Sequence, residues 1–242
     1  MRLYAGIIQA RMGSVRLPGK SMAQIYNKLS LLEMVIQRVL KSKNLDMIIL
    51  ATSTNTNCDP LVEIADSLGI LVVRGSETNV LSRFEDAIRA YNPDAIVRIC
   101  ADNPLIDPEE IDKLVNYFEM NHFDYSTNNM YECGLPDGLG CEIVLSDVLL
   151  KTTSNVLDNQ YREHVTKYIT DHQDDFHIGL LKAEEELWYP DLKLDIDSAE
   201  DLERMKDLCS ALPVEKSPYW TAKEIINIVR SKNIDKVKEV YS

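Results

Sequence analysis

The 242-residue chain lacks the sequence features of several common protein classes. It has no run of eighteen apolar residues that could cross a membrane, and Arg11 interrupts the first apolar stretch too early for a secretory signal. Only five cysteines are present, none in a C-x-x-C pair, and the four histidines lack H-E-x-x-H spacing. We therefore predict neither a zinc or redox motif nor a histidine metal site, and we expect a cytoplasmic protein with reduced thiols.

Positive charge is also scarce. The chain has 26 Lys and Arg against 39 Asp and Glu, which gives a net charge of −13. No block of five like charges occurs, so the acidic residues are expected to be spread over a solvated surface. A nucleic-acid binder usually needs a basic face, and we expect neither a nucleic-acid nor a membrane partner. A few basic side chains gathered at one place could still bind a small anion.

Short apolar runs alternate with helical periodicity through the first half of the chain. The runs at 3–8, 47–51, 71–73 and 95–100 predict strands, and helices are predicted to begin near residues 30, 59, 80 and 107. This alternation is typical of an α/β fold, with a mostly parallel twisted sheet and helices on both faces.

After about residue 124 the alternation gives way to a loop-rich stretch. There we predict a helix over 161–169, strands near 177–182 and 192–196, and two last helices from 198 and 221. No linker rich in Pro, Gly or Ser divides the chain, so a single domain with an irregular second-half insertion is expected.

The loop after the first strand, residues 9–20, carries three cations: Arg11, Arg16 and Lys20. Ligands of parallel sheets bind beyond the carboxyl ends of the strands. Glycines in the loop allow backbone N–H groups to approach an anion. The segment is neither G-x-x-x-x-G-K-[ST] nor G-x-G-x-x-G. It predicts an anion-binding loop, and the alternative is a polar turn with solvated cations.

Two further segments carry carboxylates. Asp102 follows the fourth strand, where a carboxylate suits a divalent cation that bridges phosphates; the alternative is a residue that caps a turn. Asp195 and Asp197 alternate along the predicted strand 192–196 and would share one face. Two neighbouring carboxylates repel unless a cation lies between them. The alternative is a turn residue beside a solvated carboxylate.

Together these segments resemble the CMP-sugar synthetase family of acylneuraminate and 3-deoxy-octulosonate cytidylyltransferases, in particular the spore-coat polysaccharide synthesis protein F-like branch. The nucleotide loop of that family resembles ARMGSVRLPGK, and its metal-binding Asp-x-Pro segment resembles ADNPLI. Its late Asp-containing strand and helix resemble DIDSAEDLERM, and a segment of the spore-coat branch resembles YREHVTKYI. The resemblance covers roughly residues 3–210 in the same order and implies a Rossmann-like nucleotidyltransferase.

The resemblance implies Mg²⁺-dependent transfer of a cytidylyl group from CTP to an acidic sugar or related acid, with release of pyrophosphate, in the synthesis of a surface glycan. A substrate oxygen would attack the α-phosphorus. Two alternatives stay open. The first is the same chemistry with another nucleotide or a phosphorylated acceptor. The second is a nucleotide-binding or glycosyltransferase-like protein without this activity.

The resemblance also implies an organisation of the single domain 1–242: a nucleotide-binding half over about 1–123, an acceptor-binding and dimerisation insertion over about 124–190, and a closing strand and helices over about 191–242. It implies a homodimer. Catalytic roles would fall to Arg11, Lys20 and Asp102. The residues implied to bind the nucleotide are Ala10, Arg11, Gly13, Ser14, Arg16, Lys20, Thr52, Ser53, Asn55, Arg74 and Asp102.

The implied acceptor-binding residues are Asn103, Asn129, Arg162, His164 and Tyr168, and the implied Mg²⁺ ligands are Asp102, Asp195 and Asp197. His164 could equally be a polar histidine on a helix. Met12 stands where acylneuraminate enzymes carry Gly, and Asn103 follows Asp102 where they carry Glu or Ser. Both differences concern the identity of the acceptor more than that of the nucleotide.

Overall fold

The computed structural model describes residues 2–14, 16–153 and 159–232. Parts of three expected segments lie outside these residues: position 15 of the nucleotide loop, 154–158 of the insertion and 233–242 of the closing helices. Each helix within the described ranges is too short or too polar to span a bilayer.

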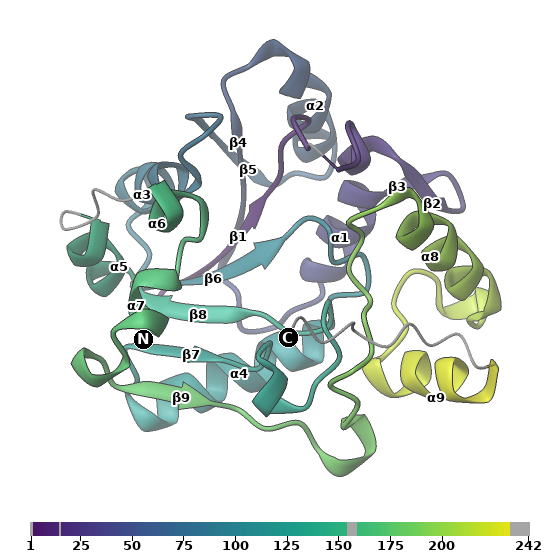
Figure 1. The fold of residues 1–242 in the computed structure, drawn as a ribbon. Helices are drawn as coiled ribbons and strands as arrows, with labels where there is room; N and C mark the ends of the chain where they lie inside the picture. The colour runs from purple at the N-terminus through teal and green to yellow at the C-terminus, as the bar shows by residue number, and fades with distance from the viewer. Residues whose placement is uncertain (1, 15, 154–158, 233–242) are drawn as a thin grey trace.

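The first half of the chain forms the parallel part of one sheet (Figure 1). Its strands are β1 (Tyr4–Gln9), β4 (Met47–Ser53), β5 (Leu71–Gly75) and β6 (Ala95–Cys100), in the spatial order β5-β4-β1-β6. Ile7 of β1 is in register with Ile49 on one side and with Arg98 on the other. These four strands confirm the predicted α/β alternation. The apolar runs of β1, β4 and β6 reflect burial on both faces, whereas β5 lies at the edge of the sheet and is only partly buried.

The second half extends the same sheet beyond β6. β8 (Glu142–Leu145) pairs antiparallel with β6 and with β7 (Tyr125–Thr127), and β9 (Ile178–Leu180) pairs parallel with β7. The sequence pattern indicated only β9. β7 and β8 flank the stretch 128–140, whose Asn, Gly and Pro residues indicate loops and obscured both strands.

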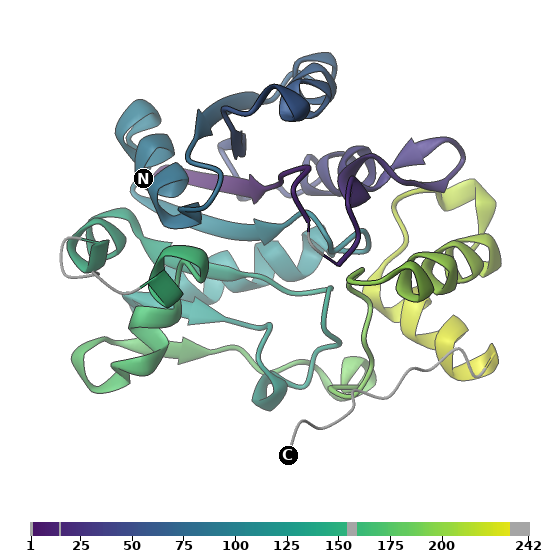
Figure 2. The ribbon, with the colours of Figure 1, turned by 45° about the horizontal axis from the view of Figure 1, so that its top comes forward.

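Helices cover both faces of the sheet, as the sequence predicted (Figures 1 and 2). One apolar cluster packs one face under α1 (Leu31–Val39), α2 (Asp59–Ser67), α4 (Pro108–Asn121), α8 (Ala199–Ala211) and α9 (Ala222–Lys232). The opposite face carries α3 (Val80–Tyr91), α5 (Ser146–Thr153), α6 (Asn159–Glu163) and α7 (Lys167–Asp171).

Short elements connect these layers. A hairpin of β2 (Gln24–Tyr26) and β3 (Leu29–Ser30) follows the first loop. The 3₁₀ helices are η1 (Lys20–Met22), η2 (Thr56–Cys58), η3 (Tyr131–Cys133), η4 (Gln173–Asp175), η5 (Glu185–Leu187) and η6 (Val214–Lys216).

Two sequence predictions in the second half are wrong. The strand near 192–196 is absent, because this segment makes only an isolated bridge between Lys193 and Asp137. The helix expected over 161–169 is interrupted between α6 and α7, where the Thr166 hydroxyl donates a hydrogen bond to Glu142 across 2.7 Å. In both places contacts with distant residues override the local pattern.

Arg38 joins α1 to two loops in the core. Its side chain is fully buried, and the guanidinium donates hydrogen bonds to the carbonyls of Leu105, Ile106, Pro218 and Trp220. Burial lowers the pKa of Arg38 to about 10, so the group remains charged at neutral pH. The loop that follows Asp102 is thereby fixed to the C-terminal part of the domain.

We predict that Arg38→Met lowers the free energy of unfolding by about 3–5 kcal/mol, because several buried carbonyls would lose their donors. Urea unfolding followed by circular dichroism measures this change. Arg89→Met, on the exposed face of α3, is the matched control and should change stability by less than about 0.5 kcal/mol. An equal loss in both variants would contradict the role assigned to Arg38.

Candidate functional site

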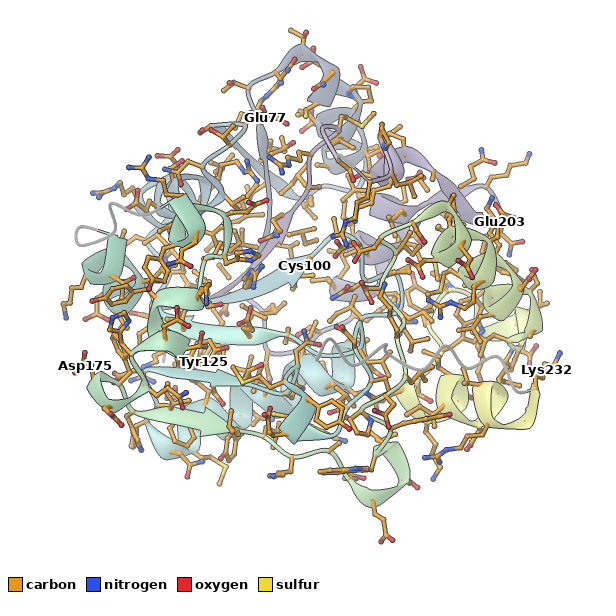
Figure 3. All side chains as sticks on the ribbon, viewed as in Figure 1. Glu77, Cys100, Tyr125, Asp175, Glu203 and Lys232 are labelled. Carbon is orange, nitrogen blue, oxygen red and sulfur yellow. The ribbon has the colours of Figure 1, made fainter. Side chains whose placement is uncertain are left out.

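A cavity of about 350 Å³ lies where the loop after β1 meets the carboxyl end of β6. Figure 3 labels Cys100, the last residue of β6, near the centre of the view. The lining comes from β1 and the loop after it, α3, β6 with the start of its loop, and the end of α6: Gln9, Ala10, Arg11, Ser14, Arg16, Lys20, Ser21, Val80, Arg83, Arg98, Cys100, Ala101, Asp102, Glu163 and His164.

Positive charge dominates this cavity although the whole chain is acidic. Five cationic side chains line it, against two carboxylates, Asp102 and Glu163. The cations are Arg11, Arg16, Lys20, Arg83 and Arg98. The lining residues thus carry an excess of three positive charges in a chain of net charge −13, which favours an anionic ligand.

Lys20 lies between two carboxylates that are far apart in the sequence. Its Nζ atom is 2.9 Å from Oδ2 of Asp102 and 3.5 Å from Oδ1 of Asp197, and it also donates to the carbonyl of Ile196 across 2.8 Å. Arg16 pairs with the other oxygen of Asp197 at 2.8 Å. The fold thus gathers Asp102, Asp197 and two loop cations at one point.

Asp195, expected beside Asp197 as a metal ligand, pairs with Lys193 at 3.0 Å. Its Oδ1 atom is buried and has no hydrogen-bond partner in the described part of the chain. Burial and, after it, the Asp137 carboxylate raise the pKa of Asp195 to about 6. Among residues 2–14, 16–153 and 159–232, no three His, Cys, Asp or Glu side chains are grouped as a metal site.

Arg83 is a cavity residue that sequence reasoning missed. Its side chain is 2% exposed and donates to the carbonyl of Ser76 across 2.6 Å, while Arg11 donates to the carbonyl of Glu77 across 2.7 Å. Burial, followed by the charge of Arg11, lowers the pKa of Arg83. One feature of the sequence could have indicated it: Arg83 falls within the apolar stripe of its helix, where a charged side chain is buried and requires polar partners.

The backbone of the loop is fixed by close contacts. Gly19 is in the left-handed region at φ +73°, and its N–H donates to the carbonyl of Met12. A Cβ atom at Gly13 would lie 2.4 Å from a carboxylate oxygen of Glu77. Ala10 and Ser14 line the cavity, and the Ser14 hydroxyl accepts from the N–H of Leu17.

Four further residues that were expected to bind the nucleotide hold the loop after β4. Thr52 and Ser53 are fully buried, and Asn55 accepts a hydrogen bond from the Asn57 N–H at the start of η2. Arg74 donates to the carbonyls of Ser53 and Asn55 and pairs with Asp59 at 2.7 Å. Thr52, Ser53, Asn55 and Arg74 are not part of the cavity lining.

Among the expected acceptor residues, His164 alone is part of the lining. Arg162 lies two residues before it, in α6. Tyr168 stacks on His172 with ring centroids 4.1 Å apart, within an aromatic cluster. Asn103 is buried in the segment after β6. Asn129 has a buried Oδ1 without a partner among the described residues.

Arg98 of β6 is a second cavity residue that the sequence analysis did not identify, and Glu142 is its partner. Arg98 donates from Nε to Gln9 across 3.1 Å and pairs through Nη1 with Glu142. The other carboxylate oxygen of Glu142 accepts from the hydroxyls of Tyr125, at 2.6 Å, and Thr166, at 2.7 Å. Burial alone would raise the pKa of Glu142, but the Arg98 charge and these hydrogen bonds hold it below its usual value.

The sheet order, its covering helices and the cavity at the strand ends are those of a Rossmann-like nucleotidyltransferase. Residues 5–226 match the model of the cytidylyltransferase family, and the chain belongs to this family. It is therefore an enzyme, a cytidylyltransferase. Over 238 residues it is 36% identical to the spore coat polysaccharide biosynthesis protein SpsF of Bacillus subtilis, with 96% of each chain covered.

Solved structures are similar over most or all of the chain. A cytidylyltransferase from Leptospira borgpetersenii superimposes with a TM-score of 0.91 at 28% identity, and the match covers 100% of both chains. A CMP:2-keto-3-deoxy-manno-octonic acid synthetase complexed with CTP gives a TM-score of 0.63 at 15% identity, over 86% of this chain and 98% of that one. The second likeness shows the shared fold alone.

Proposed function

We propose that the protein transfers the cytidylyl group of CTP to an acidic sugar or related acid, with Mg²⁺ and with release of pyrophosphate, in the synthesis of a surface glycan. The observation that carries this proposal is that five cationic side chains and Asp102 line one cavity at the carboxyl end of the sheet. The spore-coat polysaccharide relative supports the pathway, and the octonic acid synthetase supports CTP as donor and a sugar acid as acceptor.

The loop cations suit the triphosphate. Lys20 extends from the loop after β1 to Asp102, and Arg16 extends from the same loop to Asp197. Arg11 and Arg83 donate to carbonyls of the segment before α3. Attack on the α-phosphorus transfers charge to the leaving pyrophosphate, and fixed cations stabilise that charge without reorganising. In this proposal Arg11, Arg16 and Lys20 hold the phosphates, together with backbone N–H groups near Gly13 and Ser14. Ala10, whose own N–H donates to the carbonyl of Ala51, lines the nucleotide site beside them.

The carboxylates of Asp102 and Asp197 suit Mg²⁺. Both contact the same ammonium group, so their oxygens already converge on one positive charge. Carboxylate oxygens are the ligands that Mg²⁺ prefers, with phosphate oxygens and water completing the shell. When bound, the ion supplies positive charge that draws electrons from the phosphate. We propose Asp102 and Asp197 as its ligands and Asp195 as a further ligand, with Lys20 released to the phosphates.

We also propose a cytoplasmic homodimer. The five cysteines are all free, which fits a reducing compartment. In the second half, Tyr131 and Trp188 are 55% and 44% exposed. They lie on neighbouring segments, because the N–H of Tyr189 donates to the carbonyl of Gly134 across 2.8 Å. Exposed aromatic side chains of this kind are enriched at interfaces between proteins.

We predict that CTP binds more tightly than UTP, GTP or ATP in a thermal-shift panel with Mg²⁺. Lys20→Ala should weaken CTP binding about 10- to 100-fold in titration calorimetry, because one charge-assisted contact is lost. Lys43→Ala is the matched control: it removes an exposed lysine before β4, at the opposite end of the sheet. A folded Lys20→Ala variant with unchanged CTP affinity, or a preference for another nucleotide, would contradict the proposed donor site.

We predict that Asp102→Asn or Asp197→Asn lowers turnover about 100-fold or more without unfolding the protein, and that chelation of Mg²⁺ abolishes pyrophosphate release. If the two residues share one ion, the double variant should be little worse than either single one. Asp195→Asn should cost less, because Asp195 pairs with Lys193. The control is Asp207→Asn on the exposed side of α8. Strictly additive losses would mean separate roles.

We predict a mass in light scattering of twice one chain. Replacing Tyr131 and Trp188 together by Asp should shift the protein toward the monomer, because charges would then be buried in the interface. Met120→Asp, at the 80% exposed methionine of α4, removes an apolar side chain elsewhere and should not change the mass. A wild-type monomer at every concentration would rule out the dimer.

A further inference from the structure

Arg98 lies apart from the cations of the nucleotide loop. It lies on β6, two residues before that strand ends at Cys100, whereas Asp102 lies in the turn after the strand. Arg98 and Cys100 point to the same face of the strand, and both line the cavity, as does His164. We call the part of the cavity at Lys20 and Asp102 its outer end and the part at Arg98 its inner end.

The Nη2 nitrogen of the Arg98 guanidinium can donate its two N–H groups to a ligand. Nε bonds to Gln9 and Nη1 to Glu142, whereas Nη2 makes no hydrogen bond to residues 2–14, 16–153 or 159–232. The side chain is 15% exposed and is part of the cavity lining. A guanidinium pairs best with a group that accepts two parallel hydrogen bonds, such as a carboxylate.

Glu142 holds this guanidinium in place. Arg98 and Glu142 are direct partners in the β6–β8 ladder, so their side chains leave the sheet on the same face. Tyr125, labelled below Cys100 in Figure 3, and Thr166 donate to the other carboxylate oxygen. Thr166 lies two residues after His164, so a single carboxylate orients Arg98 and anchors the break between α6 and α7.

The charge of this pair selects for a monoanion. Because Glu142 balances the charge of Arg98, the two side chains together contribute little net positive field at a distance. A carboxylate needs one opposed charge and two donors. A phosphate dianion would bring a second negative charge close to the buried Glu142 carboxylate, at a cost in repulsion and desolvation.

We propose that Glu142 is a positioning residue that holds Arg98 as the specificity-determining contact to the carboxylate of the acceptor. The inference rests on the proposed function, since it requires an acidic acceptor. It assigns the inner end of the cavity to the acceptor's negative group and leaves the outer end to the triphosphate. The reacting hydroxyl of the acceptor would then lie between the two ends, on the side of Asp102.

The test compares two forms of one acceptor. Pyrophosphate release is measured with CTP and Mg²⁺, using 3-deoxy-manno-octulosonate or N-acetylneuraminate and the C1 carboxamide of each. We expect wild-type kcat/KM to be about 10- to 100-fold higher for the acid than for the amide. Arg98→Gln should reduce that preference to less than about threefold by raising KM for the acid, while KM for CTP stays within about twofold. Arg98→Lys should retain part of the preference.

Glu142→Gln keeps the shape of the side chain and removes the charge that orients Arg98. It should lower the acid preference by an intermediate amount, again with KM for CTP unchanged. Glu110→Gln on α4 removes another buried carboxylate, paired with Lys113, and is the matched control that should leave the preference intact. If Glu142→Gln unfolds, Arg98→Met combined with Glu142→Gln removes both charges and avoids an unpaired one.

The outcomes distinguish a wrong role for Arg98 from a wrong proposed function. A preference for the acid that survives Arg98→Gln would overturn this inference and leave the proposed function standing. An equal rise of KM for CTP and for the acid would also overturn it, because Arg98 would then serve the nucleotide. A wild-type enzyme that uses a neutral or phosphorylated acceptor instead would overturn the proposed function and this inference together.

Discussion

The ammonium group of Lys20 connects three parts of the chain that carry the candidate chemistry. It contacts Asp102 after β6, Asp197 in the segment before α8, and the carbonyl of Ile196. Two carboxylates from distant segments would repel each other at this position without a cation between them. Because the loop after β1 supplies that cation, the end of the sheet can hold both acidic groups side by side.

The two halves of the sheet perform different tasks. The parallel strands β1 and β6 end at the same edge of the sheet. The loop after β1, with its three cations, begins at this edge and lines the cavity. The antiparallel addition of β8 places Glu142 opposite Arg98, so the second half contributes a buried charge to the first. Through Thr166 the same carboxylate fixes the break that carries His164. The second half therefore continues the sheet of the first half and also contributes Glu163 and His164 to the cavity lining.

Buried arginines are a recurring means of holding this fold together. Arg38 ties the loop after Asp102 to the C-terminal part of the domain through four backbone carbonyls. Arg83 fixes the loop before α3 beside Arg11. A planar group with five donors can satisfy several carbonyls of irregular loops at once, which an apolar side chain cannot do. The loops around the cavity are thus held by charged side chains that lie inside an acidic protein.

The sequence by itself determined the parallel half of the sheet and the loop with Arg11, Arg16 and Lys20, because long apolar runs and clustered charges are local signals. It also indicated that Asp102 and Asp197 belong together. Only the tertiary structure decided that β7 and β8 extend the sheet, that 192–196 is not a strand, and that Arg83, Arg98 and Glu142 belong to the site. These features depend on partners many residues away. The charge of Arg83 within an apolar stripe indicates burial but does not identify the carbonyls and cavity that it contacts.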